Sequence, residues 1–470
     1  MSEMQSPNTQ PDSGDDQVFY KKREKIFPRE VSGVFNRLRY LSMFILLGLY
    51  YFVPYIQWGE RQAVLFDLPA RKFHIFGLTL WPQDFFYLAT LLIISALALF
   101  FFTALAGRLW CGYACPQTVW TETFLWIERK IEGNRQKQIK LDKKEMNAEK
   151  FMKRFAKHTA WLVFSLWTGF TFVGWFTPID QLWDATLSNN LGPWETFWIL
   201  FYAFATYGNA GWFREQMCIY MCPYARFQSA MFDKDTLLIA YDEKRGEPRG
   251  GRKKSSDPAE LGLGSCIDCK LCVQVCPTGI DIRNGLQYQC IGCAACIDVC
   301  DDVMDQMGYE KGLVRYTTEH SLHNETTHVL RPRMIVYGLL LLGITGALMY
   351  SMFTRIPLEV DIIRDRNSLY VETDEGLIEN VYNVKILNMT DAPQTYKLSI
   401  QGIEDAELVL DEHKTQFDIE GGGILELPLR VRTDPVNLKS TSNPIHFHVK
   451  SLTTEGIEKL EEGRFLGPRG

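Results

Sequence analysis

The sequence lacks several features that would assign it to a familiar class of redox or secreted protein. No G-x-G-x-x-G motif follows a predicted strand, so the chain has no recognisable dinucleotide site of its own. No short apolar core with a small-residue cleavage site follows the first charged residues, so we expect no secretory signal peptide. No cysteine follows Cys300, so a C-terminal domain must be stable on its hydrophobic core alone.

Eight of the twelve cysteines lie in one short stretch, residues 266–300. The stretch contains two C-x2-C-x2-C-x3-C motifs separated by thirteen residues. This spacing is typical of proteins with two iron–sulfur clusters, in which the fourth cysteine of each motif binds the cluster of the other motif. We therefore predict two [4Fe-4S] clusters, with the ligands Cys266, Cys269, Cys272 and Cys300 for cluster 1 and Cys290, Cys293, Cys296 and Cys276 for cluster 2.

Structural zinc and a disulfide framework explain this stretch less well. Zinc needs four ligands per ion, and its two ligand pairs are usually separated by a longer loop. Disulfides need an oxidising compartment, whereas the charge pattern places the stretch in the cytoplasm, where thiols stay reduced. One departure from the ferredoxin pattern is Asp301, which follows Cys300 where a proline is expected. It affects the expected turn more than the expected ligands.

Five long apolar runs predict transmembrane helices. Each run has about the 20 residues that cross roughly 30 Å of hydrocarbon. Trp and Tyr cluster at several of their ends, as is typical of the membrane interface. The predicted spans are Tyr40–Trp58, Phe85–Ala106, Thr159–Phe176, Thr196–Phe213 and Met334–Phe353.

Lysine and arginine are distributed asymmetrically among the segments between these spans. The N-terminal segment is basic, and the loop 107–157 carries twelve Lys or Arg against six acidic residues, whereas the loop 177–193 carries none. The excess of positive charge predicts that the N-terminus, the loop 107–157 and the cluster domain lie in the cytoplasm. Five crossings then place everything after Phe353 on the far side, which is the periplasm if the membrane is a bacterial inner membrane.

Residues 358–470 predict a different kind of domain. Apolar and polar residues alternate in several runs, and Gly, Asp, Asn and Pro lie between the runs. This pattern is typical of a small antiparallel β-sandwich of immunoglobulin-like size. The predicted fold class is therefore a multi-domain membrane protein, with an α-helical bundle of five spans, a cytoplasmic ferredoxin-like domain and a periplasmic immunoglobulin-like sandwich.

The chain is expected to divide into five parts. The predicted domains are a disordered and basic cytoplasmic N-terminus at 1–38, four spans at 39–213, a cytoplasmic domain at 214–333 with its ferredoxin-like region at about 258–305, the fifth span at 334–353, and the sandwich at 358–470.

The remaining four cysteines form two C-x3-C-P motifs, each a few residues past the cytoplasmic end of a predicted span. They are Cys111, Cys115, Cys218 and Cys222. Proline disfavours the helical conformation for the residue before it and is favoured at the first position of a helix. Cys115 and Cys222 are therefore expected to cap new helices, where the helix dipole lowers the pKa of a thiol and favours the thiolate.

Three uses of these four thiols compete. Buried cysteines often have only a structural role, and a dithiol switch is disfavoured because the thioredoxin-like βαβ context is absent. Thiolates select copper(I) over harder ions, and Met217 and Met221 place thioethers beside the second motif. We therefore predict that the four cysteines are catalytic and bind copper, with Met217 and Met221 as candidate further ligands.

Two other polar features are interpreted as structural and not as functional sites. Tyr207, Gly208 and Asn209 interrupt the fourth predicted span and are interpreted as a helix-packing device in preference to a quinone or metal pocket. The histidines between the clusters and the fifth span are interpreted as a solvated linker, with a transient copper site as the less favoured alternative. These histidines are His320, His323 and His328.

Three stretches, WCGYACPQTVW, MCIYMCPYARFQ and CPTGIDIRNGLQYQCIGCAACIDVC, resemble the cytochrome c oxidase accessory protein family of the CcoG/FixG/RdxA type. The likeness covers nearly the whole chain after the N-terminal tail, although the motifs are also similar to membrane ferredoxin components of nitrate and nitrous-oxide reduction systems. The resemblance implies two [4Fe-4S] clusters, copper at the four C-x3-C-P cysteines, and a role in maturing a cbb3-type haem-copper oxidase by reducing Cu(II) to Cu(I).

Three functions therefore remain open. The first is a cupric reductase, an oxidoreductase of the bacterial inner membrane. The second is a membrane electron relay between a quinol or ferredoxin donor and another redox enzyme, and the third is a non-redox copper-binding scaffold for oxidase assembly. The expected partners are the membrane, a copper transporter or chaperone, subunits of the oxidase and an unidentified electron donor. We expect no nucleic-acid partner, and the sequence leaves a homo-oligomer open.

Overall fold

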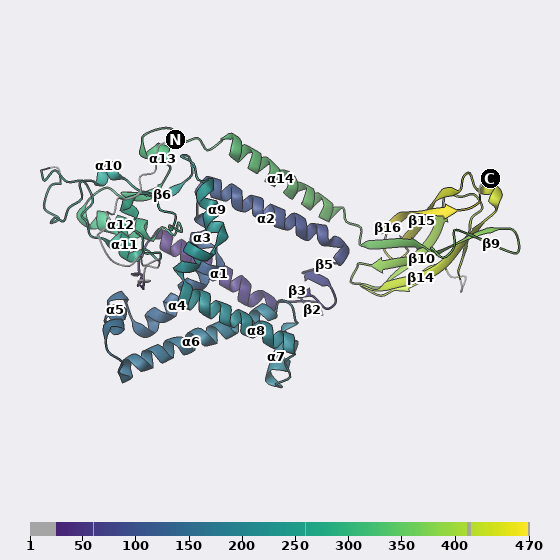
Figure 1. The fold of residues 1–470 in the computed structure, drawn as a ribbon, viewed down its shortest axis with the longest axis horizontal. Coiled ribbons are helices and arrows are strands. Elements are labelled where there is room, and N and C mark those ends of the chain that lie inside the picture. The colour runs from purple at the N-terminus through teal and green to yellow at the C-terminus, as the bar shows by residue number, and fades with distance from the viewer. Residues whose placement is uncertain (1–24, 60, 259, 411–414, 469–470) are drawn as a thin grey trace, which may run out of the picture.

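The computed structural model describes residues 25–468, except for 60, 259 and 411–414. The predicted disordered tail of residues 1–20 lies outside this part. Long helices run between two ends of the molecule, one formed by the cysteine-rich domain and the other by the C-terminal sandwich (Figure 1). Three of them are long and apolar enough to cross a membrane. They are α1 (Val34–Phe52, continued by a 3-10 turn to Tyr55), α2 (Phe85–Ala106, preceded by the turn Pro82–Asp84) and α14 (Pro332–Phe353).

The first helix begins earlier than predicted, at Val34 instead of Tyr40. Its first turn is capped by another domain, because the backbone N–H groups of Phe35 and Asn36 donate to the carboxylate of Asp298 at 3.2 and 2.7 Å. A cap supplied from so far along the chain leaves no signal in the local sequence. Residues 25–33, predicted as part of a disordered N-terminus, instead lie against the cysteine-rich domain.

The third and fourth predicted spans lie in helices of a different kind. The third lies in α6 (Ala148–Val173), whose first turns carry several lysines and an arginine. The fourth combines α8 (Pro193–Thr206) with the π-helix η3 (Tyr207–Phe213). Among the residues that the structure describes, only the three helices named above meet the length and composition expected of a span.

The helices α2 and α14 are antiparallel neighbours over their whole length. Near one end the hydroxyl of Tyr87 lies 3.1 Å from the hydroxyl of Ser351. At the other end the guanidinium of Arg331 donates to the carbonyl of Ala104 at 2.5 Å. This pair therefore joins the cysteine-rich end of the molecule to the end that carries the sandwich.

Shorter elements surround the cysteine-rich end and the loops. The helices are α3 (Leu109–Tyr113), α4 (Pro116–Glu132), α5 (Arg135–Lys143), α7 (Ile179–Leu187), the π-helix η4 (Met217–Met221), α9 (Pro223–Met231), α10 (Glu243–Gly246), α11 (Leu271–Val275), η5 (Ile282–Asn284), α12 (Ala295–Met307) and α13 (Glu319–Leu322). Strands β6 (Leu238–Tyr241) and β7 (Val314–Thr317) pair beside the cysteine motifs.

A small β-structure between α1 and α2 docks on the sandwich. Its strands are β1 (Gln57–Trp58), β2 (Arg61–Gln62), β3 (Val64–Asp67), β4 (Lys72–Ile75) and β5 (Leu78–Leu80). The guanidinium of Arg61 lies 2.8 Å from one carboxylate oxygen of Asp391, and the hydroxyl of Thr79 donates to the other at 3.1 Å. The loop between the first two long helices and the sandwich therefore lie at the same end of the molecule.

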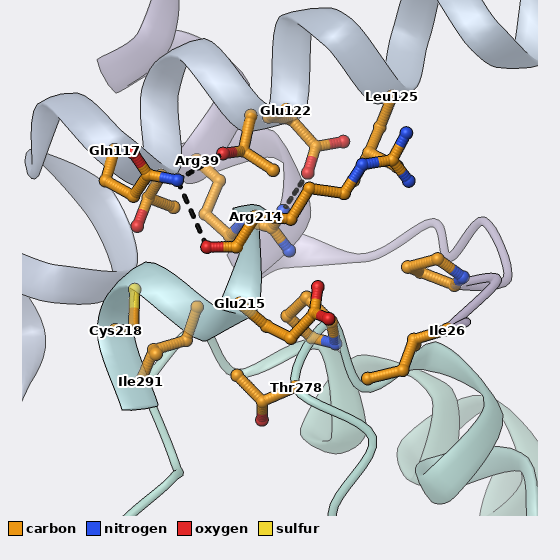
Figure 2. Close-up of a pocket in the computed structure, with 14 residues that line it drawn as sticks. Ile26, Arg39, Gln117, Glu122, Leu125, Arg214, Glu215, Cys218, Thr278 and Ile291 are labelled. Atoms are coloured by element: carbon orange, nitrogen blue, oxygen red, sulfur yellow. Dashed lines mark hydrogen bonds and ion pairs between the residues drawn. The ribbon is translucent and has the colours of Figure 1, made fainter. Parts of the chain in front are cut away.

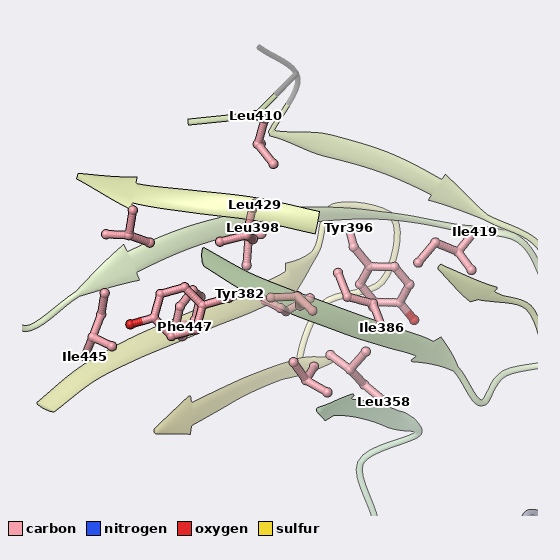
Figure 3. Close-up of a cluster of buried hydrophobic side chains, with 14 of the residues drawn as sticks. Leu358, Tyr382, Ile386, Tyr396, Leu398, Leu410, Ile419, Leu429, Ile445 and Phe447 are labelled. Carbon is pink, nitrogen blue, oxygen red and sulfur yellow. The ribbon is translucent and has the colours of Figure 1, made fainter. Parts of the chain in front are cut away.

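The C-terminal domain consists of two antiparallel sheets packed face to face (Figure 3). One has the order β12-β14-β10-β8, with β9 on β10, and the other β13-β11-β15-β16. Their bounds are β8 (Leu358–Arg364), β9 (Val371–Glu372), β10 (Ile378–Asn388), β11 (Gln394–Gln401), β12 (Glu407–Val409), β13 (Gln416–Ile419), β14 (Ile424–Thr433), β15 (Ser442–Ser451) and β16 (Glu458–Leu466), with a 3-10 turn at Pro435–Asn437. Inward side chains such as Tyr382, Leu398 and Phe447 are almost completely buried between the sheets. The alternating pattern thus predicted the sandwich correctly.

Substitution of Leu398 by alanine is expected to destabilise the sandwich by about 2–5 kcal/mol, because it leaves a cavity in a core that cannot collapse. Leu398 is 1% exposed, whereas Leu460 on the same sheet is 53% exposed and provides a matched control. Hydrogen exchange of residues 358–468 in the full chain measures the local opening free energy. Equal protection in L398A and L460A would contradict this account of the core.

A buried ionic network holds α4 against α6 and the π-helix. The ammonium of Lys157 lies 3.1 Å from Glu128 and 2.8 Å from Glu132, and the guanidinium of Arg214 lies 2.8 Å from Glu128. Lys157 and both glutamates are no more than 2% exposed. Removing one member of such a network leaves a buried charge without its partner, which is strongly destabilising.

The stability of this network is expected to depend on acid pH through Glu128. Burial raises the pKa of Glu128, but Arg214, Lys157 and Lys25 outweigh it and hold the pKa at about 2. A carboxylate whose pKa is depressed on folding stabilises the protein above its unfolded pKa, near 4.5, and this stabilisation is lost as the pH falls toward 2. The melting temperature of E128Q should therefore fall less steeply between pH 5 and pH 3 than that of wild type. The variant E145Q, at an exposed glutamate, serves as the control, and the same slope in all three proteins would refute the assignment.

Candidate metal centres

The two C-x2-C-x2-C-x3-C motifs have the same backbone conformation. In each motif the residues before and after the second cysteine have a positive φ, and the third cysteine lies in the short helix that follows, α11 or α12. These residues are Asp268 and Lys270 around Cys269, and Gly292 and Ala294 around Cys293. Left-handed residues next to helical ones turn successive backbone N–H groups inward, which is the usual lining of an iron–sulfur site.

Together the motifs enclose two small cavities, each lined by cysteines from both motifs. Apolar side chains, among them Ile239, Ile282 and Val299, line the remaining walls. The first cavity is lined by Cys266, Cys269, Cys272 and Cys300, and the second by Cys276, Cys290, Cys293 and Cys296, with Cys272 at its edge. The fourth cysteine of each motif therefore lies with the first three of the other motif, and the donor set of each cavity fits one iron–sulfur cluster.

Most thiols of these cavities are buried or half-buried, and only Cys269 among the eight is exposed. Burial raises the pKa of Cys272 to about 11 and the pKa of Cys290 and Cys300 to about 12. Four such thiols become thiolates together only when a cation compensates their charge, as iron does in a cluster.

The missing proline after Cys300 has a structural explanation. Cys276 is the C-cap of α11, so Pro277 follows the end of that helix. Cys300 instead lies inside α12 (Ala295–Met307). A proline at position 301 would remove a helical hydrogen bond and clash with the preceding turn. Asp301 continues the helix, and its carboxylate accepts the backbone N–H of Gly312 at 2.9 Å.

The two C-x3-C-P motifs form matching helix starts. Cys115 is the N-cap of α4 with Pro116 as the first helical residue, and Cys222 is the N-cap of α9 followed by Pro223. The prediction that both cysteines cap helices is confirmed. Cys218 lies on the π-helix η4, between Met217 and the exposed Met221 at the end of this helix.

Two polar side chains join the two motifs. The amide of Gln117, on α4, donates to the carbonyls of Asn209 and Arg214 at 2.8 and 3.1 Å and so holds the end of the π-helix η3. The buried guanidinium of Arg108 donates to the carbonyl of Ala225 on α9 at 2.5 Å. The first motif is thereby tied to both ends of the segment that carries the second motif.

The same arginine also ties the first motif to the second cluster cavity. Arg108 donates to the carbonyl of Cys290 at 3.2 Å and to that of Tyr288. The backbones also touch, because a Cβ atom on Gly112 would lie 2.7 Å from the carbonyl oxygen of Gly292 and 3.0 Å from the Cα atom of Cys293. The first C-x3-C-P motif therefore packs directly on the loop that lines the second cavity.

The prediction that the helix dipole lowers the pKa of a capping thiol is wrong for Cys115. Burial raises its pKa, and the backbone N–H groups of Thr118 and Gln117 lower it by less. Burial also raises the pKa of Cys111 to about 11 and that of Cys218 to about 12. The helix dipole is outweighed because these thiols face an apolar interior that disfavours the thiolate.

The four thiols are neighbours, since each acts electrostatically on the others. They are not closed around one ion, because in the described part of the chain no three cysteine sulfurs lie within 4.8 Å of one another. A pocket opens beside Cys218, with Gln117, Glu122 and Arg214 on one side and Ile291 of the cluster domain on the other (Figure 2). The thiol site therefore adjoins an opening lined by both apolar and charged side chains.

Sequence reasoning missed Arg108, Gly112 and Gln117, which position the thiols without being metal ligands. Gln228 was missed as well, although its side-chain oxygen lies 3.4 Å from the sulfur of Cys111. The only available signal was proximity, because each of them lies within six residues of a motif cysteine.

Comparison with known families gives three matches. Residues 213–319 match a 4Fe-4S dicluster domain, and residues 348–468 match the IG-like fold at the C-terminus of FixG. Residues 88–134, which include Cys111 and Cys115, match a 4Fe-4S binding domain.

Similar proteins cover most of the chain. Protein RdxB of Cereibacter sphaeroides is 42% identical over 87% of this chain and 88% of its own length. The nitrogen fixation protein FixG of Rhizobium meliloti is 38% identical over 83% of this chain and 81% of its own. A crystal structure of a FixG-related protein from Vibrio parahaemolyticus is 31% identical, with a TM-score of 0.21, and covers 23% of this chain and 95% of that one. The chain therefore belongs to the FixG/RdxA family of iron–sulfur membrane proteins.

Proposed function

We propose that this protein reduces Cu(II) to Cu(I) and supplies Cu(I) for assembly of a cbb3-type cytochrome c oxidase. The observation that carries the proposal is the contact between the first C-x3-C-P motif and the loop of Cys290 and Cys293, made through Gly112 and Arg108. Four soft ligands thus lie beside a cavity with the donor set of an iron–sulfur cluster.

The lining of the two cavities supports the predicted cluster ligands. Cluster 1 is held by Cys266, Cys269, Cys272 and Cys300, and cluster 2 by Cys290, Cys293, Cys296 and Cys276, which matches the crossed pattern of two-cluster ferredoxins. When bound, the two clusters supply one-electron transfer, which is the stoichiometry that Cu²⁺ + e⁻ → Cu⁺ requires.

Copper is the substrate of the four remaining thiols. Thiolates and thioethers are soft ligands that favour copper(I), so Cys111, Cys115, Cys218 and Cys222 hold the product more firmly than a harder ion, with Met217 and Met221 as further ligands. Because burial raises the pKa of Cys111 and Cys218, copper binding releases protons from these two thiols. The ion enters through the pocket beside Cys218.

The proposed topology has five crossings of a bacterial inner membrane. The N-terminus, the clusters and both thiol motifs lie in the cytoplasm, and the sandwich lies in the periplasm. Two observations support it: α2 and α14 connect the two ends of the molecule, and the basic segment 107–157 lies at the cysteine-rich end. The proposed partners are a copper transporter or chaperone, the oxidase subunits and an electron donor.

An electron relay without copper chemistry is the second candidate. It is favoured by one observation, namely that no three of the described cysteine sulfurs lie close enough to enclose a single ion. A relay would reoxidise rapidly with a protein partner and not with Cu(II), so the two candidates differ in a measurable way.

The double variants C111A/C115A and C218A/C222A are expected to lose cupric reduction by at least tenfold, because each removes half of the soft ligands. Anaerobically purified protein is reduced with dithionite, freed of excess reductant and mixed with Cu(II) and a Cu(I)-specific chelator. In wild type, chelated Cu(I) should appear in step with cluster reoxidation. The variant M152A, at an exposed methionine of α6, is the control. Undiminished reduction by both double variants, with intact cluster absorbance, would disprove the thiol site.

Substitution G112A is expected to slow cluster reoxidation by Cu(II) at least tenfold while the four thiols still bind Cu(I). The added Cβ atom meets the carbonyl of Gly292 at 2.7 Å and must push the motif away from the cluster loop. G251A is the control, because a Cβ atom there meets nothing within 4 Å. Stopped-flow absorbance measures the rate, and equal rates in G112A and G251A would show that this contact does not matter for transfer.

A further inference from the structure

Asp235 meets two histidines from a distant segment of the sequence, His320 and His328, where α2 ends and α14 begins. Asp235 lies in the turn after α9, His320 in α13 (Glu319–Leu322) and His328 in the segment that leads into α14. One ligand atom from each lies within 4.8 Å of the other two. The sequence-based interpretation of these histidines as a solvated linker does not explain this convergence.

The donor atoms are spaced as ligands of one ion would be. The Nδ1 atom of His320 lies 2.7 Å from Oδ1 of Asp235, in a hydrogen bond that a bound ion would replace, and Nδ1 of His328 lies 4.0 Å from the same oxygen. Metal–nitrogen and metal–oxygen bonds are about 2.0–2.2 Å long, so adjacent ligands of one ion are about 3 Å apart and opposite ligands about 4 Å apart. Both spacings occur here.

The backbone holds this arrangement in place. The N–H of His328 donates to Oδ1 of Asp235 at 2.9 Å, and the N–H of His320 donates to the carbonyl of Lys234 at 3.3 Å. The hydroxyl of Thr236, which is fully buried, donates to the carbonyl of Ala104 at the end of α2 at 3.0 Å. The three side chains are therefore anchored to the scaffold of long helices.

One further carboxylate adjoins the group. Glu325 lies 3.6 Å from Nε2 of His320, whereas Glu319 is paired with Lys234 at 3.6 Å. Arg331 is paired with Asp233 and lies 3.7 Å from Oδ2 of Asp235, which leaves Oδ1 facing the histidines. His328 is 67% exposed, so an ion can reach the group from solvent.

We propose that Asp235, His320 and His328 form a second metal site that binds Cu(II) before its reduction. The proposal rests on the proposed function for its choice of substrate. Imidazole nitrogen and carboxylate oxygen suit Cu(II), the most tightly bound of the divalent first-row ions, whereas the thiols favour Cu(I). The two donor sets therefore match the two oxidation states of one substrate.

The site lies on the same end of the molecule as the thiols. The helix α9 begins after Cys222 and ends at Met231, four residues before Asp235. Its nine residues span about 14 Å at 1.5 Å per residue. The proposed Cu(II) site and the thiol of Cys222 thus lie near opposite ends of one short helix.

The test uses full-length protein in detergent, purified through a tag without histidine. Isothermal titration with Cu(II) and with Zn(II), which is not reduced, measures affinity, and electron paramagnetic resonance of the Cu(II) sample reports nitrogen ligands. Besides binding at the four thiols, we expect one site with nitrogen hyperfine splitting. H320A/H328A should weaken binding of both ions at this site at least tenfold and lose the splitting. The matched control H446A/H448A removes two histidines from the sandwich and should change neither quantity.

Unchanged affinity and splitting in H320A/H328A, or equal loss in the control, would overturn the proposal. If the double variant does not fold, H328A alone replaces it, because removing this exposed side chain leaves no buried cavity. Its Cu(II) affinity and nitrogen splitting then decide the question in the same way. The chelator assay for Cu(I) separates this site from the proposed function. Histidine-dependent Cu(II) binding without any Cu(I) production would retain the site and reject cupric reduction. Cu(I) production without histidine-dependent Cu(II) binding would reject the histidine site and retain cupric reduction.

Discussion

The close backbone contact between Gly112 and the loop of Gly292 and Cys293 joins the first C-x3-C-P motif to the lining of the second cluster cavity. It leaves no room for a side chain at position 112, so two segments far apart in the sequence approach as closely as backbones can. Arg108 adds hydrogen bonds across the same junction. Because electron transfer weakens steeply with distance, a protein that passes electrons from a cluster to a bound ion depends on such an approach.

A buried ionic network on α4 supports this junction. Glu128 and Glu132 are buried on α4, the helix that Cys115 caps, and Lys157 and Arg214 neutralise them from α6 and from the end of the π-helix. Breaking such a network costs several kcal/mol, so it holds α4 firmly against its neighbours. Cys115, the N-cap of α4, is held in place with this helix.

Much of the domain organisation could be predicted because it depends on short-range patterns in the sequence. The spacing of the eight cluster cysteines, the C-P dipeptides that start α4 and α9, the apolar run of α2 and the alternation in the sandwich are all short-range signals. The start of α1 could not be predicted, because Asp298 caps it from another domain. The raised pKa of Cys115 could not be predicted either, because burial is a property of the packed molecule.

The amino-acid sequence by itself determined the cysteine motifs, the long apolar helices, the sandwich and the family, because these depend on residue type and spacing along the chain. Only the tertiary structure decided that the crossed cysteine sets share cavities, that the C-x3-C-P thiols lie against the second of these cavities, and that Asp235 meets His320 and His328. The physical reason is that each of these depends on contacts between segments distant in sequence, which packing and buried hydrogen bonds select and local pattern does not encode.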